Sequence, residues 1–383
     1  RKLMKKSIVA VLVGMLLLNF CAFSYSMPNN AVVQENILLV NDAATTNAGY
    51  QTMTVAGFND ITLASAPQSV IVQSDISRVD KDICKQLADN GAVIIFSNNT
   101  LKQVEAKMNG QTVPNEEIGQ YTLGTFVCKT AYGYEYGEIA YAHAEESTVF
   151  TKPQITAQTF ESIRDNLGLS NNTAQTAAAN STAPYKMYNF AVNLTRDGET
   201  IGQTWCRQYV YKRAKYMQNG TRKSMWDVVS LMRVTPYSPW GVEEYDTRMH
   251  CNAGNQECIE DTYLESDGTY TNTLNIGITV SVDTIEGNVG YSHSYTYDND
   301  SQTITNHLPY GNVKEWYVEV IPWREAHSWH IEPAIRFINH NDQNMSGAWS
   351  QITRVKLRKF VVIGIDASFN LDSGDYDCGD WFS

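Results

Sequence analysis

Long apolar runs are almost missing from this sequence, and the clearest one lies close to its start. Ile8–Leu18 form a short apolar core that follows four basic residues within the first six positions. No later stretch is long enough for a membrane-spanning helix, which needs about 20 apolar residues. A basic start, a short apolar core and the small residues Ser24 and Ser26 are typical of an export signal. The sequence therefore predicts that residues 1–26 are removed and that the protein is secreted.

Basic residues are also in short supply. The chain has 29 Lys and Arg against 41 Asp and Glu, which gives a formal net charge of −12. Loss of residues 1–26 removes four basic and no acidic side chains, which lowers the net charge to about −16. An acidic surface repels phosphates, so we expect no nucleic-acid partner. The one dense basic stretch, Arg207 to Lys223, indicates either a basic face on an amphipathic strand or a contact for acidic groups such as anionic headgroups.

Cysteine is sparse, but its number is even once the export signal is removed. Of seven cysteines, one lies within the export signal and six remain. An even count in an exported protein predicts disulfides, although many connectivities are open. Cys251 and Cys258 are close enough to close their own loop, and a Cys84–Cys128 bond would tie one small domain together. Zinc is the alternative, but the short paired spacings of zinc sites are missing.

Motifs for catalysis are missing as well. No glycine-rich phosphate loop follows the apolar runs of the first half, which argues against a nucleotide cofactor. The sequence has no G-x-S-x-G nucleophile elbow and no zinc-protease helix motif. We therefore predict no catalytic residues, no enzymatic activity and no organic cofactor.

What the chain does contain is a series of distinct segments. Residues 27–66 are polar and are expected to form an exposed lead-in. Residues 67–150 alternate short apolar runs with helical spacings, which predicts a strand–helix–strand–helix order, then a hairpin, and hence a small α/β domain. Residues 151–184 are expected to form a helix from about Thr156 to Leu167 and then a small, polar, flexible linker.

From residue 185 to residue 383 the pattern is of the β type. Eight segments alternate apolar and polar residues between turn-like gaps, which predicts a sandwich of two antiparallel sheets. Residues 243–267 hold eight acidic residues against one arginine and are interpreted as an exposed acidic loop. The predicted fold class is α+β, with a small α/β N-terminal domain followed by a mostly antiparallel β-sandwich domain.

The sharpest alternation lies between Leu274 and Tyr297. Each arm of this segment has about ten residues, the length that a tilted strand needs to cross a bilayer. The face opposite the apolar one is small and carries one charge, Asp283, as the lining of a water-filled pore allows. An antiparallel sheet with one face on a core shows the same alternation, so both interpretations stay open. The residues expected to face lipid are Ile276, Ile278, Val280, Val282, Val289, Tyr291 and Tyr295.

A resemblance favours the membrane interpretation. The run GYSHSYTYDNDSQTITNHLPYGNVKEWYVEV, Gly290 to Val320, resembles a segment of the leukocidin/hemolysin family of β-barrel pore-forming toxins. The resemblance implies a secreted, soluble monomer that assembles into a homo-oligomeric ring on a target membrane. It also implies that the small α/β domain is a removable pro-region. The residues that carry it are Tyr291, Ser292, Ser294, Tyr295 and Tyr297, with Lys314 and Trp316 further along.

An aromatic cluster favours a second function. Trp323, Trp329 and His330 lie within one short segment, and tryptophan gathers where a side chain has one buried and one wet end. The alternative hypothesis is therefore a secreted β-sandwich protein that binds a cell-surface glycan or protein through these side chains, without enzymatic activity.

Acidic residues near the C-terminal end provide a weak metal candidate. They are close together and accompanied by two glycines, and calcium prefers six to eight oxygen ligands on a turning chain. A solvated acidic tail is the alternative. The candidate ligands are Asp372, Asp375, Asp377 and Asp380.

Overall fold

The architecture is given by a computed structural model of the chain. The structure describes these residues: 37–40, 52–55, 57–61, 68–169, 184–218, 221–251, 256–262, 270–271, 296–297, 302–306, 313–320, 327–331, 333–339, 349–359 and 364–376. The predicted export signal, residues 1–26, lies outside these ranges. None of the helices within them has the length and apolar character that crossing a bilayer requires.

The α/β part begins with a parallel βαβ unit, as the sequence predicts. β3 (Ser69–Val72) and β4 (Val93–Phe96) pair in parallel, and α2 (Lys81–Asp89) connects them. The Asp80 carboxylate accepts hydrogen bonds from two backbone N–H groups in the first turn of α2, which fixes where this helix begins.

The next elements also follow the prediction. α3 (Leu101–Met108) begins with a capping box formed by Thr100 and Gln103. The hairpin of β5 (Thr122–Thr130) and β6 (Gly133–His143) then adds two antiparallel strands beside β4. α2 and α3 cover one face of these strands.

The other face is covered by α4 (Ala157–Leu167), which begins one residue after the predicted start. Its buried side chains Phe160, Ile163 and Leu167 recur at helical spacing, so a single apolar stripe faces the sheet. Gly168 ends the helix in the left-handed conformation, with φ at 70°, which glycine adopts without steric cost.

Part of the predicted lead-in is a buried strand. β1 (Ile37–Val40) pairs in parallel with β3 on one side and with β2 (Thr52–Val55) on the other. All four residues of β1 are buried. Because a strand between parallel neighbours is covered on both faces, an uninterrupted apolar run suits it. The expectation of an exposed lead-in is therefore wrong for Ile37–Val40.

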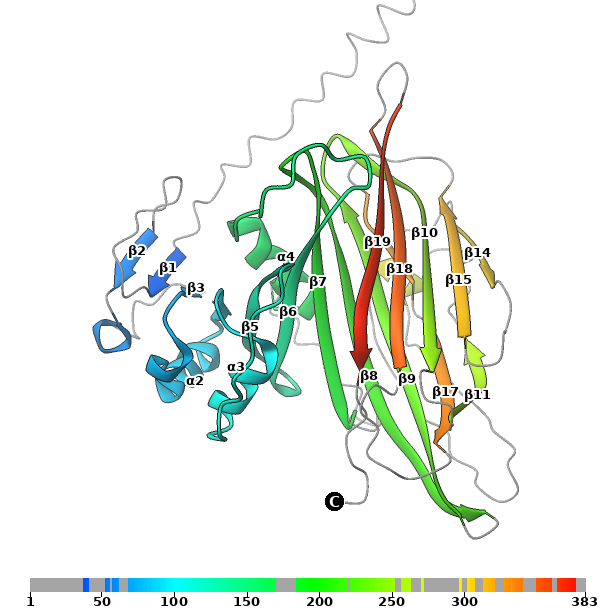
Figure 1. Cartoon of the computed structure of the whole chain (residues 1–383), viewed down its shortest axis with the longest axis horizontal. Coiled ribbons are helices and arrows are strands. Elements are labelled where there is room, and N and C mark those ends of the chain that lie inside the picture. The colour runs from blue at the N-terminus through cyan, green and yellow to red at the C-terminus, as the bar shows by residue number, and fades with distance from the viewer. Residues whose placement is uncertain are drawn as a thin grey trace, which may run out of the picture.

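A single mixed sheet runs from the α/β part into the β-rich part (Figure 1). Its further strands are β7 (Lys186–Arg196), β8 (Glu199–Gln218), β9 (Thr221–Pro236), β11 (Gln256–Thr262), β16 (Trp329–Ile331) and β17 (Ala334–Asn339). The order is β11-β17-β9-β8-β7-β6-β5-β4-β3-β1-β2, with β16 also paired to β9. The parallel pairing of β6 with β7 joins the two parts.

A second sheet is wholly antiparallel, in the order β14-β15-β10-β18-β19. Its strands are β10 (Trp240–Cys251), β14 (Gln302–Asn306), β15 (Val313–Val320), β18 (Trp349–Lys359) and β19 (Ile365–Tyr376). The prediction of a β-rich fold is confirmed by these two sheets, although the larger one is mixed rather than antiparallel.

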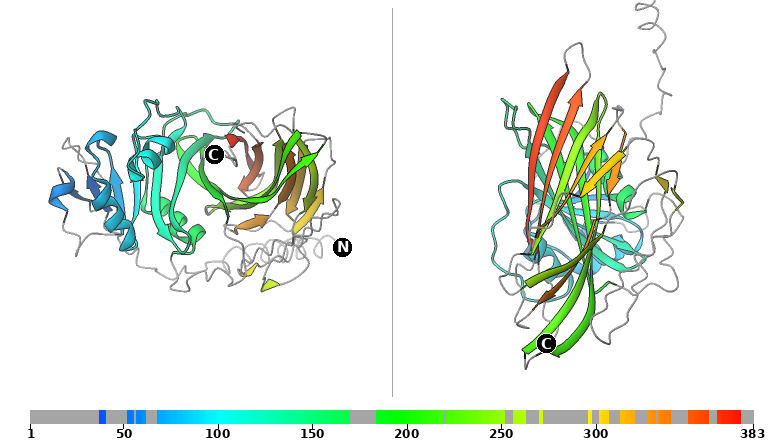
Figure 2. Two further views of the ribbon diagram at one scale, coloured as in Figure 1. Left: turned by 90° about the horizontal axis from the view of Figure 1, so that it is seen from below. Right: turned by 90° about the vertical axis from the view of Figure 1, so that its right-hand side faces the viewer.

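The two large sheets contribute to one hydrophobic core (Figure 2). The larger sheet supplies buried residues such as Val210, Trp226 and Met232, and the smaller sheet supplies Tyr245 and Leu357. Burial of aromatic and aliphatic side chains from both sheets is the main force that holds such layers together.

A polar cluster centred on Gln351 of β18 lies inside this core. The Gln351 side-chain oxygen accepts hydrogen bonds from Gln208 Nε2 at 2.5 Å and from Ser230 Oγ at 3.0 Å. Its amide nitrogen donates to Thr247 Oγ1 at 2.7 Å, and Trp349 Nε1 donates to Gln208 Oε1 at 3.0 Å. Buried polar groups are costly unless paired, so this cluster restricts how the two sheets can face each other.

The interpretation of residues 243–267 as an exposed acidic loop is wrong, because most of them belong to β10 and β11. Glu243 forms ion pairs with Lys356 at 2.9 Å and Arg358 at 2.6 Å, both on β18. Arg248 pairs with Glu315 of β15 at 2.5 Å. Cations and anions on adjacent strands thus compensate one another, which the local acidic count does not reveal.

A buried ion pair connects the two parts of the large sheet. Arg207 Nη2 of β8 donates to Glu135 Oε1 of β6 at 2.5 Å, and both side chains are only 1% exposed. Asn189 of β7, which lies between these strands, donates to Glu135 Oε2 at 3.1 Å. Arg207, the first residue of the basic stretch, is therefore buried and does not contribute to a basic surface.

We predict that Glu135→Gln lowers the free energy of unfolding by about 3–5 kcal/mol, because it leaves the Arg207 charge buried without its partner. Chemical denaturation measures this change. Lys129→Ala is the control, since it removes an exposed ion pair with Asp89 and an exposed contact with the Tyr134 ring, and should change stability little. The double variant Glu135→Leu/Arg207→Met should lose less than Glu135→Gln alone. A loss equal to or larger than that of Glu135→Gln would contradict this account of the pair.

Candidate functional site

The predicted membrane segment begins and ends at a small separate sheet. β12 (Tyr270–Thr271) and β13 (Thr296–Tyr297) pair antiparallel, with Tyr270 opposite Tyr297 and Thr271 opposite Thr296. Within the described ranges these two strands pair only with each other. The residues expected to face lipid lie outside the described ranges: Ile276, Ile278, Val280, Val282, Val289, Tyr291 and Tyr295.

The predicted ligand contact at Trp329 is wrong. The Trp329 side chain is 1% exposed and belongs to the core between the two large sheets. Its ring lies 4.7 Å from the His327 ring. β16 pairs with β9, which turns Trp329 toward this core. His330 lies opposite Arg233 in the same pairing, but its side chain and all of Trp323 lie outside the described residues.

The predicted Cys84–Cys128 disulfide is also wrong. Cys84 and Cys128 are buried free thiols on opposite sides of the large sheet: Cys84 belongs to α2, and Cys128 of β5 points to the α4 face. Cys206 is a third buried free thiol. The side chains of Cys251 and Cys258 lie outside those described, so their bond stays a prediction.

The two calcium candidates within the described residues lie on a strand rather than in a turn. Asp372 and Asp375 lie within β19, where the chain is extended and paired with β18. Asp377 and Asp380 lie outside the described residues. No cluster of three or more potential metal ligands is found in the described part of the chain. The calcium site stays a prediction.

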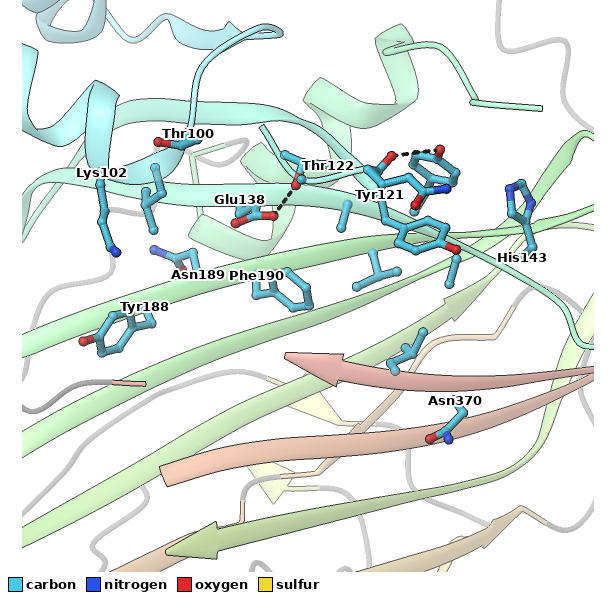
Figure 3. Close-up of a pocket in the computed structure, with 18 of the residues that line it drawn as sticks. Thr100, Lys102, Tyr121, Thr122, Glu138, His143, Tyr188, Asn189, Phe190 and Asn370 are labelled. Atoms are coloured by element: carbon cyan, nitrogen blue, oxygen red, sulfur yellow. Dashed lines mark hydrogen bonds between the residues drawn. The ribbon is translucent and has the colours of Figure 1, made fainter. Parts of the chain in front are cut away.

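A cavity of about 1030 Å³ lies where α3, β6, β7 and β19 approach one another (Figure 3). No sequence motif predicted it. Its lining comes from chain segments near residues 100–122, 138–150, 186–192 and 370–371, which are far apart in the sequence. Its volume is at the upper end of the range of small-molecule sites.

Aromatic rings form a row along this cavity. The centroids of Tyr121 and Tyr141 lie 5.7 Å apart, those of Tyr141 and His143 5.3 Å, and those of His143 and Phe150 5.2 Å. Successive planes meet at 70°, 76° and 88°, so each ring presents an edge to its neighbour. The alternation along β6 places Tyr141 and His143 on one side of that strand.

Carboxylates and amides line the same cavity (Figure 3). Thr122 Oγ1 donates to Glu138 Oε1 at 2.6 Å. Burial raises the pKa of Glu105 above its ordinary value, although the positive charge of Lys186 opposes this shift. The Asn189 amide nitrogen donates to Glu135 Oε2 and to the backbone oxygen of Tyr136, both at 3.1 Å.

This arrangement is suited to binding. Aromatic surface, carboxylates and amides can hold a polar ligand that also has apolar faces. The exposed Tyr121 and Phe150 give a weak signal in the sequence, because each is a large aromatic residue in a polar loop. Nothing in the sequence places them together.

Comparisons with known proteins add little. No protein-family model matches the chain, and no curated protein matches it. Among solved structures, Clostridium perfringens delta-toxin is similar at 7% identity and a TM-score of 0.21, over 46% of this chain and 92% of that one. A structure described as a pore forming protein is similar at 8% identity and a TM-score of 0.19, over 47% and 89%.

The membrane-inserted form of the Clostridium perfringens NetB toxin is similar at 7% identity and a TM-score of 0.16, over 44% of this chain and 91% of that one. These findings amount to a weak structural similarity to pore-forming toxins. Scores of this size carry no argument about fold or function.

We predict that Cys84, Cys128 and Cys206 do not react with iodoacetamide in the folded protein between pH 7 and pH 9. Burial raises the pKa of Cys84 and of Cys206 to about 12 and raises that of Cys128 as well. Because the thiolate is the reactive form, these thiols stay protonated and inert in this range. Peptide mass spectrometry should find all three alkylated only after denaturation without reductant. A Cys84–Cys128 linked peptide, or labelling of the folded protein, would contradict this.

Proposed function

We propose that this protein is a secreted, pore-forming, toxin-like protein that acts on membranes through the hairpin from Leu274 to Tyr297. The observation that supports this most is the antiparallel register of β12 and β13. It brings the two ends of a strongly alternating segment together, outside both large sheets.

The register has a consequence for the faces of the hairpin. If the pairing of Tyr270 with Tyr297 continues along the sequence, Ile276 comes opposite Tyr291 and Ile278 opposite Val289. Opposed residues of an antiparallel pair share one face, so this face is apolar. A slip of one residue would mix the two faces.

The other face is small and polar in the same register, since Gly277 comes opposite Gly290 and Thr279 opposite Asn288. A hairpin with one apolar and one polar face fits a barrel wall that has lipid on one side and water on the other. In this register the connection between the two arms falls at Asp283 and Thr284, beside the run TIEG, whose Gly287 can supply the positive φ of a tight turn.

The separation of β12 and β13 from the large sheets argues against an ordinary sandwich hairpin. A sandwich hairpin shares hydrogen bonds with neighbouring strands, whereas this base pairs only with itself within the described ranges. An isolated two-stranded hairpin is at best marginally stable in water. A hairpin of this kind would therefore be stabilised by a lipid bilayer that covers its apolar face.

The cost of unpaired backbone groups in lipid also predicts self-assembly. A single hairpin in lipid has two edges with unpaired backbone groups, and each unpaired group is costly there. Several copies must therefore pair edge to edge and close a barrel. The proposal thus includes a homo-oligomer on the target membrane.

We expect the purified protein, intact or cleaved between residues 169 and 184, to release dye from liposomes. Ile278→Asp/Val280→Asp should lower the rate at least about tenfold, because a charge that faces lipid costs on the order of 1–2 kcal/mol. The matched control is Thr279→Asp/Ser281→Asp, which places the same charges on the polar face and should keep most of the release.

Circular dichroism and thermal melting show whether each variant is folded. Equal losses of release by the two folded double variants would count against the proposed faces. Unfolding of the Ile278→Asp/Val280→Asp variant would place these residues in a protein core instead. Absence of release by every folded, unsubstituted form would contradict the proposed function.

A further inference from the structure

The cavity beside α3 and β7 takes no part in the proposed hairpin, yet it has the features of a binding site. Phe150 and Tyr121 are 66% and 54% exposed, more than any other large apolar side chain in the described part of the chain. Both line the cavity. Exposed aromatic side chains that gather at one concave site are typical of ligand binding rather than of ordinary surface.

The charges of the lining restrict the ligand. Glu105, Glu116, Glu138 and Glu145 line the cavity together with two lysines, of which Lys102 forms an ion pair with Glu116 at 3.2 Å. This excess of carboxylates repels phosphate and sialic acid. The mixture of donors and acceptors suits a neutral ligand that has many hydroxyl groups.

The shape of the aromatic lining restricts it further. A compact organic cation is best held where several ring faces converge on one point. Here four rings form a row, each edge-on to the next, from Tyr121 to Phe150. Tyr141 in this row is only 8% exposed, so the exposed rings of Tyr121 and Phe150 offer two separate apolar contacts. Two such contacts fit a chain of several sugar rings, since each sugar ring has one apolar face.

We infer that this cavity binds a neutral oligosaccharide, with Tyr121 and Phe150 stacked on sugar rings. The ligand would contact both the α/β part, through the segment before β5, and the β-rich part, through β7 and β19. Its role as the attachment to a target-cell glycan rests on the proposed function. The binding itself does not, because it needs no membrane.

The first experiment presents the purified protein to immobilised neutral and sialylated oligosaccharides, and the best ligand is then measured by isothermal titration calorimetry. We expect a neutral oligosaccharide to bind. Phe150→Ala and Tyr121→Ala should each weaken binding about tenfold, because each removes one ring contact. Both side chains are exposed, so the variants should melt like the unsubstituted protein.

Tyr185→Ala is the matched control, because Tyr185 is 43% exposed but lies outside the cavity, and binding should be unchanged. Binding of no saccharide, equal effects of all three variants, or preference for phosphocholine or sialylated ligands would overturn the inference. Dye release from glycan-free liposomes without saccharide binding would leave the proposed function standing. Saccharide binding without dye release from any membrane would leave only the cavity assignment standing.

Discussion

The buried ion pair of Glu135 and Arg207 is the constraint on which the arrangement of the two parts depends. It joins β6 to β8 across β7, and Asn189 of β7 contributes a third polar group. A buried charge strongly resists separation from its partner. The α/β part therefore cannot swing away from the β-rich part without exposing or orphaning these groups.

Two consequences follow from this constraint. The large sheet continues from the α/β part into the β-rich part, with β6 and β7 in parallel register. The wall of the cavity also lies at this connection, since Asn189 belongs both to the ion-pair cluster and to the lining. Any separation of the two parts would disrupt the ion pair and the cavity together.

The β-rich part consists of two large sheets that pack on each other and of a small separate sheet formed by β12 and β13. The polar cluster around Gln351 and the core around it hold the two large sheets face to face. β12 and β13 lie in a sheet of their own. The proposed membrane action needs two large sheets that keep their shape while the segment between Thr271 and Thr296 enters the bilayer.

The sequence predicts the elements whose signals are local. The start of α4 is predicted within one residue, and the two apolar runs of the βαβ unit predict β3 and β4. β10 is not predicted, because its acidic residues resemble those of a solvated loop. Their partners on neighbouring strands, Lys356, Arg358 and Glu315, are distant in the sequence. Local charge counts cannot reveal such pairs.

The candidate sites also depend on contacts between distant residues, which the sequence does not show. The Cys84–Cys128 bond is not formed because Cys84 lies on α2, which covers one face of the sheet, whereas Cys128 of β5 points to the other face. The sequence does not show which face a helix covers. The predicted ligand contact at Trp329 is wrong because the pairing of β16 with β9 places this side chain in the core. The cavity was not predicted because its lining is assembled from four distant segments, none of which carries a motif.

The most direct test of the central claim measures whether the register of β12 and β13 continues into the membrane segment. In Ile278→Cys/Val289→Cys the two cysteines would be directly opposed, whereas in Ile278→Cys/Asn288→Cys they would lie on opposite faces. Opposed cysteines are close enough for a disulfide, and cysteines on opposite faces point apart. The account predicts oxidative cross-linking of the first pair and not of the second, by peptide mass spectrometry. Equal cross-linking of both pairs, or of the second pair alone, would contradict it.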